Sequence, residues 1–543
     1  MKANIFPNKL YIFIENKKNK NMKIKILFFG LLYILSFQII TGTNYYCDPV
    51  NGKLDNNGLT KSSAWPALES VISGKSILAG DTIYLMSGDH GSPFINKSYS
   101  EDVVITKFPD EHPVIKFIVF SGASHWKLDS LTISSEGIRV RFDPPLEHPV
   151  YPVKDNSLIQ ITDKSSNITI ENCFIASVEN SSGWTKNDWN YKAWNGIYCT
   201  QNSDITIRNC HLKNINFGIH NTSSCVNHLY EHNIIENFGG DGLRGHGTNT
   251  VIQYNVVKNA YDTNGNHDDM LQAFSGDPLG LVLRGNLFAS HTNPSQPFKS
   301  KCQGIGCFDG TFYDFIIENN IVATSHWHGI TLLGAENCKI INNTVVDLDN
   351  SDSSKPWIMI GDHKDGTPSS NCIIRNNITP TVKEGTGVTI DHNLLVSYSE
   401  YDTYFVDFDN FNLQLKQGTP AVDAGSESEA PSIDILRNSR PWGDGYDIGA
   451  YEFEKSTNVE NINFLDDSDF PELYPNPTTG KVNFKFHGAV AGNMVISDIT
   501  GKKIMDKQIR SQQGSLDLSE NSSGIYFVYV ETDKKTCHKI IKL

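Results

Sequence analysis

Two adjacent aspartates, Asp268 and Asp269, follow His267 at the start of an apolar alternation, in the stretch YDTNGNHDDMLQAFSG of residues 261–276. Neighbouring carboxyl groups raise one another's pKa, so one can stay protonated as an acid while another acts as a base. Carboxylate oxygens also suit a hard divalent cation. The pair is therefore a candidate for proton transfer or metal binding, and the alternative is that it only ends a loop.

Five further segments have an Ile or Leu at their third position, which we expect to face inward. They are NGIYCT (195–200), FGIHNT (217–222), DGLRGHG (241–247), QGIGCFDG (303–310) and HGITLLG (328–334). Aligning the Ile or Leu gives one column with Asp241, Asp269, Gln303 and His328, and a next outward column with Tyr198, His220, Arg244 and Gln272. Stacked strands lie about 4.8 Å apart. We therefore expect the three aspartates to crowd one patch, flanked by Arg244, His246, His267 and His328.

Between these segments runs a second repeat, in which β-branched residues alternate and an Asn precedes more apolar residues. The shared Asn falls at Asn172, Asn209, Asn233, Asn255, Asn286, Asn320, Asn343, Asn377 and Asn393. The smaller spacings, 22 to 24 residues, fit one coil of a parallel β-solenoid. We expect the Asn to take a left-handed turn conformation and to stack on its neighbours.

This repeat resembles the right-handed parallel β-helix of the pectin-lyase-like superfamily, over about residues 80–450. The predicted class is all-β, a right-handed parallel β-helix followed by a small C-terminal β-sandwich. The segment from Tyr45 is suited to capping the first coil, and GDTIYL (80–85) is expected to be the first strand. GTPAVDAG (418–425) and YDIGAYEF (446–453) resemble the closing segment of secreted β-helix proteins.

The C-terminal part changes character. LYPNPTTGKVNFKF (473–486), SDITGKKI (497–504) and SSGIYFVYVETDKKTCHKIIKL (522–543) indicate short strands joined by Gly and Asn turns. These motifs resemble the C-terminal sorting domain of the type IX secretion system of Bacteroidetes. The resemblance implies export by the type IX secretion machinery, with the protein secreted or attached to the cell surface.

At the N-terminus, a short basic stretch from Met22 precedes an apolar run over residues 26–40, which is typical of a secretory signal rather than a membrane span. Translation from Met1 or Met22 stays open. The predicted domains are a signal region (1–43), the β-helix catalytic domain (44–453), a linker (454–470) and the sorting domain (471–543). We expect a monomer without a transmembrane segment in the mature chain.

Charge and cysteines limit the partners. A formal net charge of −15 argues against nucleic acid, while an acidic glycan can still bind a local basic surface.

Cys173 and Cys210 occupy matching repeat slots, as do Cys338 and Cys372, which favours apolar stacks over disulfides. No CxxC with metal spacing occurs, so a zinc site is not expected.

Two families of the superfamily have comparable polar layouts. GGDGL and HDDMLQAFSG resemble the N-T-D-G and D-D segments of polygalacturonases, although QGIG replaces their G-H-G and no R-x-K follows. This resemblance implies inverting hydrolysis without a cofactor, with one aspartate of the pair Asp268 and Asp269 as acid and the other activating water together with Asp241.

Family 9 pectate lyases instead hold calcium between a D-G and an S-D-D-G-F-D segment and use a lysine further on as base. Asp241, Asp268 and Asp269 match three of those ligand positions, which implies Ca²⁺ as a cofactor. The fourth position is Gln272, and the lysine slot near Cys307 is empty. Lys299 or Lys301 could substitute from the loop, or a histidine could serve as base.

The residues together predict a secreted enzyme that cleaves glycosidic bonds of an acidic polysaccharide, either uronate-containing or sulfated. Hydrolysis is favoured over calcium-dependent β-elimination because no lysine stands at the lyase slot, and a non-catalytic glycan-binding β-helix is the third alternative. The predicted catalytic residues are Asp241, Asp268, Asp269 and His328. The predicted substrate-binding residues are Arg244, His246, His267, Gln272, Gln303 and Trp327. Aromatic rings can stack on sugars, and further basic side chains, Lys299, Lys301 and Lys364, suit uronate or sulfate groups.

Overall fold

The computed structural model describes residues 42–138, 156–350 apart from 264, 266 and 275, 355–453, and parts of 472–542. The predicted linker lies outside the described residues, as does the predicted signal region except for residues 42 and 43. No described helix is long and apolar enough to cross a membrane.

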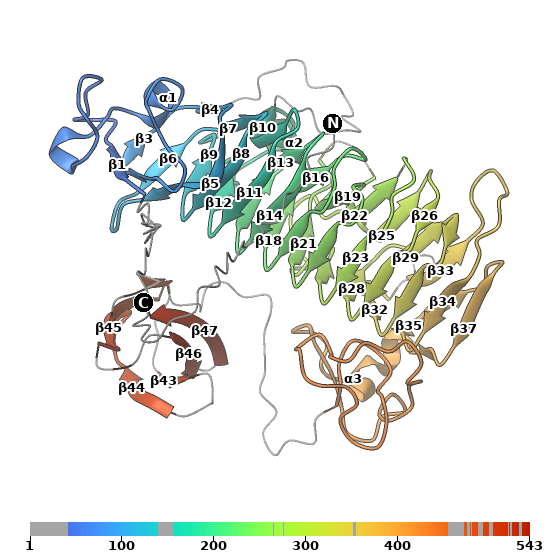
Figure 1. Ribbon diagram of the computed structural model, residues 1–543. Helices are drawn as coiled ribbons and strands as arrows, with labels where there is room; N and C mark the ends of the chain where they lie inside the picture. The colour runs from blue at the N-terminus through green and yellow to red at the C-terminus, as the bar shows by residue number, and fades with distance from the viewer. Residues whose placement is uncertain are drawn as a thin grey trace, which may run out of the picture. The chain divides into compact units, whose positions relative to one another are not determined.

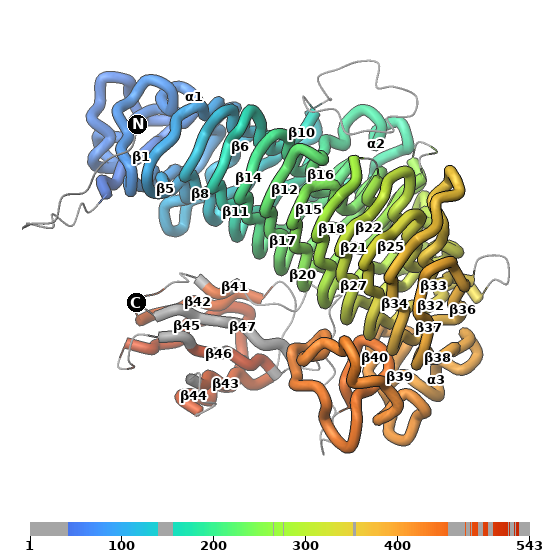
Figure 2. Tube along the Cα trace, turned by 45° about the vertical axis from the view of Figure 1, so that its right-hand side comes forward, coloured from blue at the N-terminus to red at the C-terminus, as the bar shows by residue number. Residues whose placement is uncertain are grey.

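Three long parallel sheets make up the first part of the described chain (Figure 1). In each sheet the strands follow one another in chain order, because every coil adds one strand to each sheet (Figure 2). The predicted right-handed parallel β-helix is confirmed.

The 13-stranded sheet consists of β1 (Asn44–Cys47), β2 (Thr82–Leu85), β5 (Ser98–Lys107), β8 (Ser124–Asp129), β11 (Ser166–Glu171), β14 (Ser203–Arg208), β17 (Leu229–Glu231), β20 (Val251–Gln253), β23 (Val282–Arg284), β27 (Ile316–Glu318), β31 (Lys339–Ile341), β34 (Cys372–Arg375) and β37 (Val388–Asp391). The 12-stranded sheet consists of β3 (Gly88–Asp89), β6 (Pro113–Ile115), β9 (Thr132–Ser134), β12 (Phe174–Ala176), β15 (His211–Ile215), β18 (Ile234–Phe238), β21 (Val256–Ala260), β24 (Leu287–Ala289), β28 (Ile321–Thr324), β32 (Thr344–Asp347), β35 (Ile378–Thr379) and β38 (Leu394–Leu395).

The 11-stranded sheet carries the predicted site. It consists of β4 (Phe94–Ile95), β7 (Ile118–Ser121), β10 (Ser157–Thr162), β13 (Asn195–Cys199), β16 (Ile219–Asn221), β19 (Leu243–Gly245), β22 (Asp269–Phe274), β25 (Gln303–Phe308), β29 (His328–Leu333), β33 (Trp357–Gly361) and β36 (Thr381–Lys383). Two short pairs, β26 (Phe312–Tyr313) with β30 (Ala335–Glu336) and β39 (Phe405–Asp407) with β40 (Asn412–Leu415), lie outside the three sheets.

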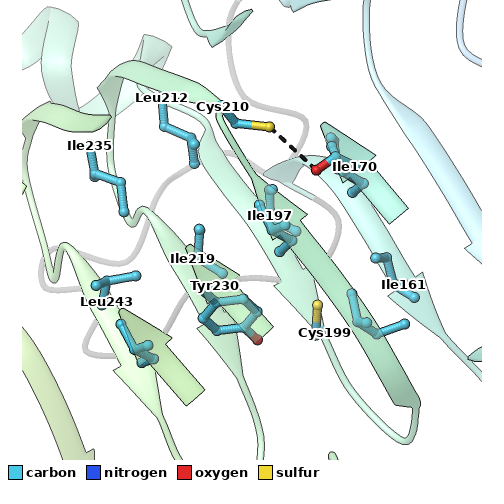
Figure 3. Packing of buried hydrophobic residues seen from close by; sticks show 14 of the residues in the cluster. Ile161, Ile170, Ile197, Cys199, Cys210, Leu212, Ile219, Tyr230, Ile235 and Leu243 are labelled. Atoms are coloured by element: carbon cyan, nitrogen blue, oxygen red, sulfur yellow. Dashed lines mark hydrogen bonds between the residues drawn. The ribbon is translucent and has the colours of Figure 1, made fainter. Parts of the chain in front are cut away.

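Columns of apolar side chains fill the coil. Ile197, Ile219 and Leu243 pair in register on consecutive strands and are buried (Figure 3). Burying one such side chain stabilises the fold by about 1.5–3 kcal/mol, and β-branched residues suit the pleated surface. Repetition of the same inward position therefore fixes the register of every strand, including those that carry polar residues outward.

A ladder of asparagines, buried except for the half-buried Asn393, runs along one corner of the coil. The amide of each bonds to the next in the order Asn233, Asn255, Asn286, Asn320, Asn343, Asn377 and Asn393. The expectation that these residues take the left-handed conformation is wrong, because that conformation falls on the residue just before each, such as His232 and Tyr254. Asn172 and Asn209 do take it, so they stand one position before the ladder and not in it.

Cysteines occupy the ladder position on the earlier coils. Cys210 follows Asn209, and its N–H donates to Asn233 Oδ1 at 3.0 Å. Its thiol lies 3.6 Å from the Ile170 carbonyl oxygen (Figure 3). The nine described cysteines are all buried and free, which confirms the predicted apolar stacks at Cys173, Cys210, Cys338 and Cys372.

The two ends of the coil differ in part from expectation. The first strand is β1, so GDTIYL forms the second strand and not the first. The short helix α1 (Leu68–Val71) buries Leu68 and Val71 in the same core as the first strands. At the other end, the helix α3 (Tyr401–Tyr404) and the segments 418–425 and 446–453 pack on the outer face of the 12-stranded sheet, through Ala421, Ile448 and Tyr451.

The C-terminal part forms two antiparallel sheets with a shared core that includes Val482, Met494 and Leu516. Their strands are β41 (Glu472–Tyr474), β42 (Lys481–Lys485) and β45 (Gln513–Asp517) in one, and β44 (Lys503–Ile509), β43 (Gly492–Asp498), β46 (Gly524–Glu531) and β47 (Lys535–Lys542) in the other. The predicted small β-sandwich is confirmed.

Candidate active site

The predicted polar columns lie on β13, β16, β19, β22, β25 and β29, which are neighbours in the 11-stranded sheet (Figure 1). Tyr198 pairs with His220, His220 with Arg244, and Arg244 with Gln272, which confirms the outward column. In the other column Asp269 pairs directly with Gln303. At His328 the register shifts, and this residue pairs with Trp357.

Backbone bonds hold the two aspartate-bearing coils together. The Asp269 N–H donates to Asp241 Oδ1 at 3.0 Å, and the Gly242 N–H donates to the Asp269 carbonyl oxygen at 2.9 Å. On the other side, the Gln303 N–H donates to the Asp268 carbonyl oxygen at 2.9 Å. The three aspartates are thus brought together, as predicted, and each is buried.

Asp241 forms an ion pair with Arg244. Arg244 Nε donates to Asp241 Oδ2 at 2.5 Å, and the guanidinium lies over the rings of Phe217 and Phe274, 4.7 and 5.1 Å from their centres. Burial raises the pKa of Asp241, and the positive charge of Arg244 opposes that rise. The two charges are therefore held in fixed positions by each other. Arg244 is engaged with Asp241 rather than held for a substrate anion.

Asp269 accepts a bond from Gln272 Nε2 at Oδ2, at 3.0 Å. Its Oδ1 is buried and has no hydrogen-bond partner among the described residues. Burial raises the pKa of Asp269 well above its ordinary value, the charge of Asp241 adds to the rise, and Arg244 opposes it. One oxygen of Asp269 is thus buried without a partner in the part of the chain that the structure describes.

Asp268 has a different environment from its neighbour, because successive residues of a strand face opposite ways. Its Oδ2 accepts from Ser300 Oγ at 2.7 Å, and Ser300 belongs to the loop before β25. Burial raises the pKa of Asp268 well above its ordinary value, with Ser300 opposing and the charge of Asp241 adding to the rise. Asp268 therefore stays protonated at a pH where an exposed aspartate is ionised.

The chain leading to this pair is braced by the helix α2 (Lys186–Lys192), which is inserted between β12 and β13. Trp189 of α2 stacks on Tyr261 with ring centres 4.8 Å apart, and Lys186 Nζ lies 3.6 Å from Asp262 Oδ2. These contacts fix the segment just before the aspartates.

His246 and His267 lie differently from each other. His246 is buried, its Nδ1 accepts from the Phe274 N–H at 3.1 Å, and burial lowers its pKa to about 3. The ring is therefore neutral, with its proton on Nε2. His267 is exposed beside the aspartate pair.

A group of rings, named here the aromatic cluster, surrounds His328 and consists of Phe308, His326, Trp327, His328 and Trp357. The ring centres of His326 and Trp327 lie 4.2 Å apart, and those of His328 and Trp357 lie 5.1 Å apart. Trp327 is 43% exposed, so one indole face is open to a sugar ring. Burial lowers the pKa of His326 and His328 to about 4, so both are neutral at pH 7.

Several contributors to the site were not predicted. The sequence did contain a signal for His326, because it belongs to a His-Trp-His run with the predicted residues Trp327 and His328. Ser300, Trp357 and Lys383 gave no local signal, since they come from a loop and from later coils. Lys383 is exposed, and its Nζ lies 3.3 Å from the centre of the Trp357 ring, which brings a positive charge to the aromatic cluster.

The two lysines proposed for the lyase alternative differ in their surroundings. Lys299 Nζ lies 3.6 Å from Asp349 Oδ1, and Lys301 is exposed. Cys307, in the lyase slot, is fully buried. Lys364 Nζ bonds to Asp309 at 2.5 Å.

The carboxyl groups do not fit a calcium site in this arrangement. In the part of the chain that the structure describes, no group of three or more His, Cys, Asp or Glu side chains could hold a metal ion. Both oxygens of Asp241 are already bonded, one to Arg244 and one to the Asp269 N–H. Calcium ligation would require the buried ion pair to open.

Residues 472–543 match the family model of the secretion system C-terminal sorting domain. The predicted sorting domain is confirmed. The protein is thus exported by type IX secretion to the cell surface or the extracellular space.

No curated protein sequence matches the chain. Among solved structures it is similar to a GH136 lacto-N-biosidase from Eubacterium ramulus, at 13% identity over 65% of this chain and 68% of that chain, with a TM-score of 0.40. It is also similar to the pectate lyase Pel9A, at 14% identity over 76% of this chain and 97% of that chain, with a TM-score of 0.37. Identities this low do not transfer a substrate or a mechanism.

Proposed function

We propose that the protein is a secreted enzyme that hydrolyses glycosidic bonds of an acidic polysaccharide. The observation that carries the proposal is the set of three buried carboxyl groups on two adjacent coils, each with a different partner. Burying such groups together costs stability, and a catalytic role explains why the fold keeps them. Pairs of carboxyl groups with separated pKa values act as acid and base in glycosidases.

The different environments of the carboxyl groups support a different role for each. Asp268, whose raised pKa keeps it protonated, donates its proton to the leaving glycosidic oxygen. Asp269 accepts a proton from the attacking water through Oδ1; burial raises its pKa, and the charge of Arg244 and the hydrogen bond from Gln272 oppose that rise. Asp241, held by Arg244, supplies a fixed negative charge beside the oxocarbenium-like transition state.

The aromatic cluster supports binding of the neighbouring sugar residues. An exposed indole face at Trp327 suits stacking on a sugar ring. Lys383 lies over Trp357, and Lys301 is close enough to influence the pKa of His326, so two ammonium groups border this surface. Those charges favour a uronate or sulfate group over a neutral sugar.

The test is a cleavage assay on a panel of uronate-containing and sulfated polysaccharides, with Asp269→Asn as the inactive control. New reducing ends without ultraviolet absorbance of an unsaturated uronate would support hydrolysis. Unsaturated products that depend on calcium would establish β-elimination instead. Retention of a glycan without any cleavage would leave only a binding protein.

A further inference from the structure

The helix α2, which projects from the coils in Figure 2, carries a lysine on the side of the site where Asp268 lies. Lys186 Nζ is 3.6 Å from Asp262 Oδ2, and the two side chains are 48% and 50% exposed. An ion pair that is so open to solvent contributes at most about 1 kcal/mol. The buried Trp189, stacked on Tyr261, is the contact of α2 that anchors the helix, so the stability of the fold does not account for Lys186.

A short antiparallel contact between two loops connects Lys186 with Asp268. The Asp262 N–H donates to the Phe298 carbonyl oxygen at 2.6 Å, and two residues further along, the Ser300 N–H donates to the Ala260 carbonyl oxygen at 3.3 Å. Lys186 Nζ lies at the Asp262 end of this contact, 5.7 Å from the centre of the Phe298 ring. Ser300 Oγ bonds to Asp268 at the other end, at 2.7 Å. The ammonium group and the carboxyl group thus border the same two loops.

The charges at the Asp262 end act on Asp268. Burial is the main cause of the raised pKa of Asp268, and among the smaller causes the charge of Asp262 adds to the rise while that of Lys186 opposes it. The effect of a charge weakens with distance and with screening by salt, so both groups lie near the proposed acid. The sugar residue whose glycosidic oxygen is protonated by Asp268 therefore lies close to Lys186.

An aromatic side chain belongs to the same segment as Lys186. Trp184 stands two residues earlier and is half-buried, with its ring held edge-on against Trp189 at 5.2 Å between centres. An indole ring suits the face of a sugar, and an ammonium group suits a carboxylate or sulfate carried by that sugar. The segment that begins α2 therefore combines the two kinds of group that an acidic sugar requires.

We propose that Lys186 binds the acidic group, carboxylate or sulfate, of the sugar residue on the leaving side of the scissile bond. This rests on the proposed function and adds a residue that determines its specificity. Asp262 holds Lys186 in the absence of substrate. Their separation of 3.6 Å is longer than a hydrogen bond, so an acidic group of the substrate can replace Asp262 as the partner of Lys186.

Two substitutions with opposite expected effects test this in the full-length protein. Lys186→Met removes the ammonium group, and we expect KM for the polysaccharide that the wild type cleaves to rise about tenfold with kcat kept, because one charge-assisted contact is lost. Asp262→Asn removes the competing carboxylate, and we expect KM to fall about threefold, since an exposed pair of this kind is weak. A purely structural pair predicts shifts in the same direction, because either substitution breaks it.

Lys192→Met is the matched control, because Lys192 lies on the same helix, is similarly exposed and pairs with Asp188 at 2.9 Å. It should leave KM unchanged. Lys186→Arg, which keeps the charge, should retain most of the affinity. The same kinetics on the polysaccharide after reduction of its carboxylates, and after removal of its sulfates, identify the acidic group, because the effect of Lys186→Met should disappear with the group that Lys186 binds.

Melting temperatures of the variants show whether each is folded. The proposal is overturned if folded Lys186→Met keeps the KM of the wild type, or if Asp262→Asn raises KM as Lys186→Met does. It is also overturned if the effect of Lys186→Met persists on a polysaccharide that has lost both kinds of acidic group. Failure of the proposed function is distinguishable, because the wild type would then release no reducing ends from any polysaccharide of the panel.

Discussion

Arg244 and Asp241 form an ion pair at 2.5 Å with side chains only 4% and 2% exposed. Two residues separate them in sequence; Arg244 lies on β19 and Asp241 stands just before that strand. A buried pair of this kind gains little over apolar packing, but either partner alone would be an uncompensated buried charge. Its presence beside two further buried carboxyl groups makes it the electrostatic centre of the site.

We predict that Arg244→Met lowers the free energy of unfolding by about 3–5 kcal/mol, because it leaves Asp241 buried and unpaired. Urea denaturation measures the loss. Arg208→Met is the control, since Arg208 pairs with Glu171 but is 42% exposed and should cost at most about 1 kcal/mol. Adding Asp241→Asn to Arg244→Met should recover part of the stability, and strictly additive losses would contradict the pairing.

Asp268→Asn and Asp269→Asn should each abolish cleavage and leave the fold intact. Their raised pKa values mean that the ionised form is disfavoured in the fold, by about 1.4 kcal/mol for each tenfold change in the ionisation constant. The wild type thus loses stability as pH rises through the folded pKa, whereas the amide variants do not. The variants should melt at a higher temperature than the wild type, by a margin that grows with pH.

Asp309→Asn is the control for these two variants, because Asp309 is an exposed carboxylate on the coil of β25. It should change neither cleavage nor the pH dependence of melting. Full activity in both the Asp268 and Asp269 variants would refute the site.

The pH profile of kcat should fall on its alkaline side when Asp268 loses its proton, above the pH at which an ordinary aspartate ionises. Ser300 donates to Asp268 and favours its charged form, so Ser300→Ala should raise the pKa of Asp268 further and move the alkaline limb to higher pH. Ser295→Ala, an exposed serine in the same loop, should leave the profile in place. A shift to lower pH in Ser300→Ala would contradict the role of Asp268 as acid.

Trp327→Ala should raise KM up to about tenfold with little change in kcat, because its ring stacks on a sugar away from the reacting bond. Trp442 is 47% exposed and lies in the closing segment, so Trp442→Ala serves as a control for loss of an exposed indole. Steady-state kinetics on the cleaved polysaccharide gives both constants. Equal effects of the two substitutions on KM would show that the aromatic cluster does not bind the substrate.

Asn320→Ala should destabilise the β-helix by about 2 kcal/mol or more, since it leaves the Asn286 amide without its acceptor and interrupts the ladder. Asn410→Ala removes an exposed amide that bonds to Asp407 and should cost far less. Equilibrium unfolding of both variants measures the difference. Equal losses in the free energy of unfolding would show that a ladder asparagine stabilises the fold no more than an exposed one.

The sequence was sufficient for the coil and for the two polar columns, because both depend on a short repeat whose inward residues set the register. Alignment by the inward residues Leu243 and Leu271 therefore placed Arg244 beside Gln272 correctly. The asparagine repeat was misaligned by one residue at Asn172 and Asn209, since Asn suits both the left-handed turn and the ladder position after it.

The remaining parts of the site depend on contacts between coils. Ser300 reaches Asp268 from a loop. Lys383 lies on β36, which pairs with the strand of Trp357 but is separated from it in sequence by a full coil. Neither position differs in type from ordinary surface residues.

The most direct test of the account compares wild type with Asp268→Asn on uronate-containing and sulfated polysaccharides, with reducing ends and unsaturated products measured in the same reaction. The account predicts that the wild type releases reducing ends without unsaturated products, with or without a calcium chelator, and that Asp268→Asn releases none. Unsaturated products, or equal release by the folded variant, would contradict it.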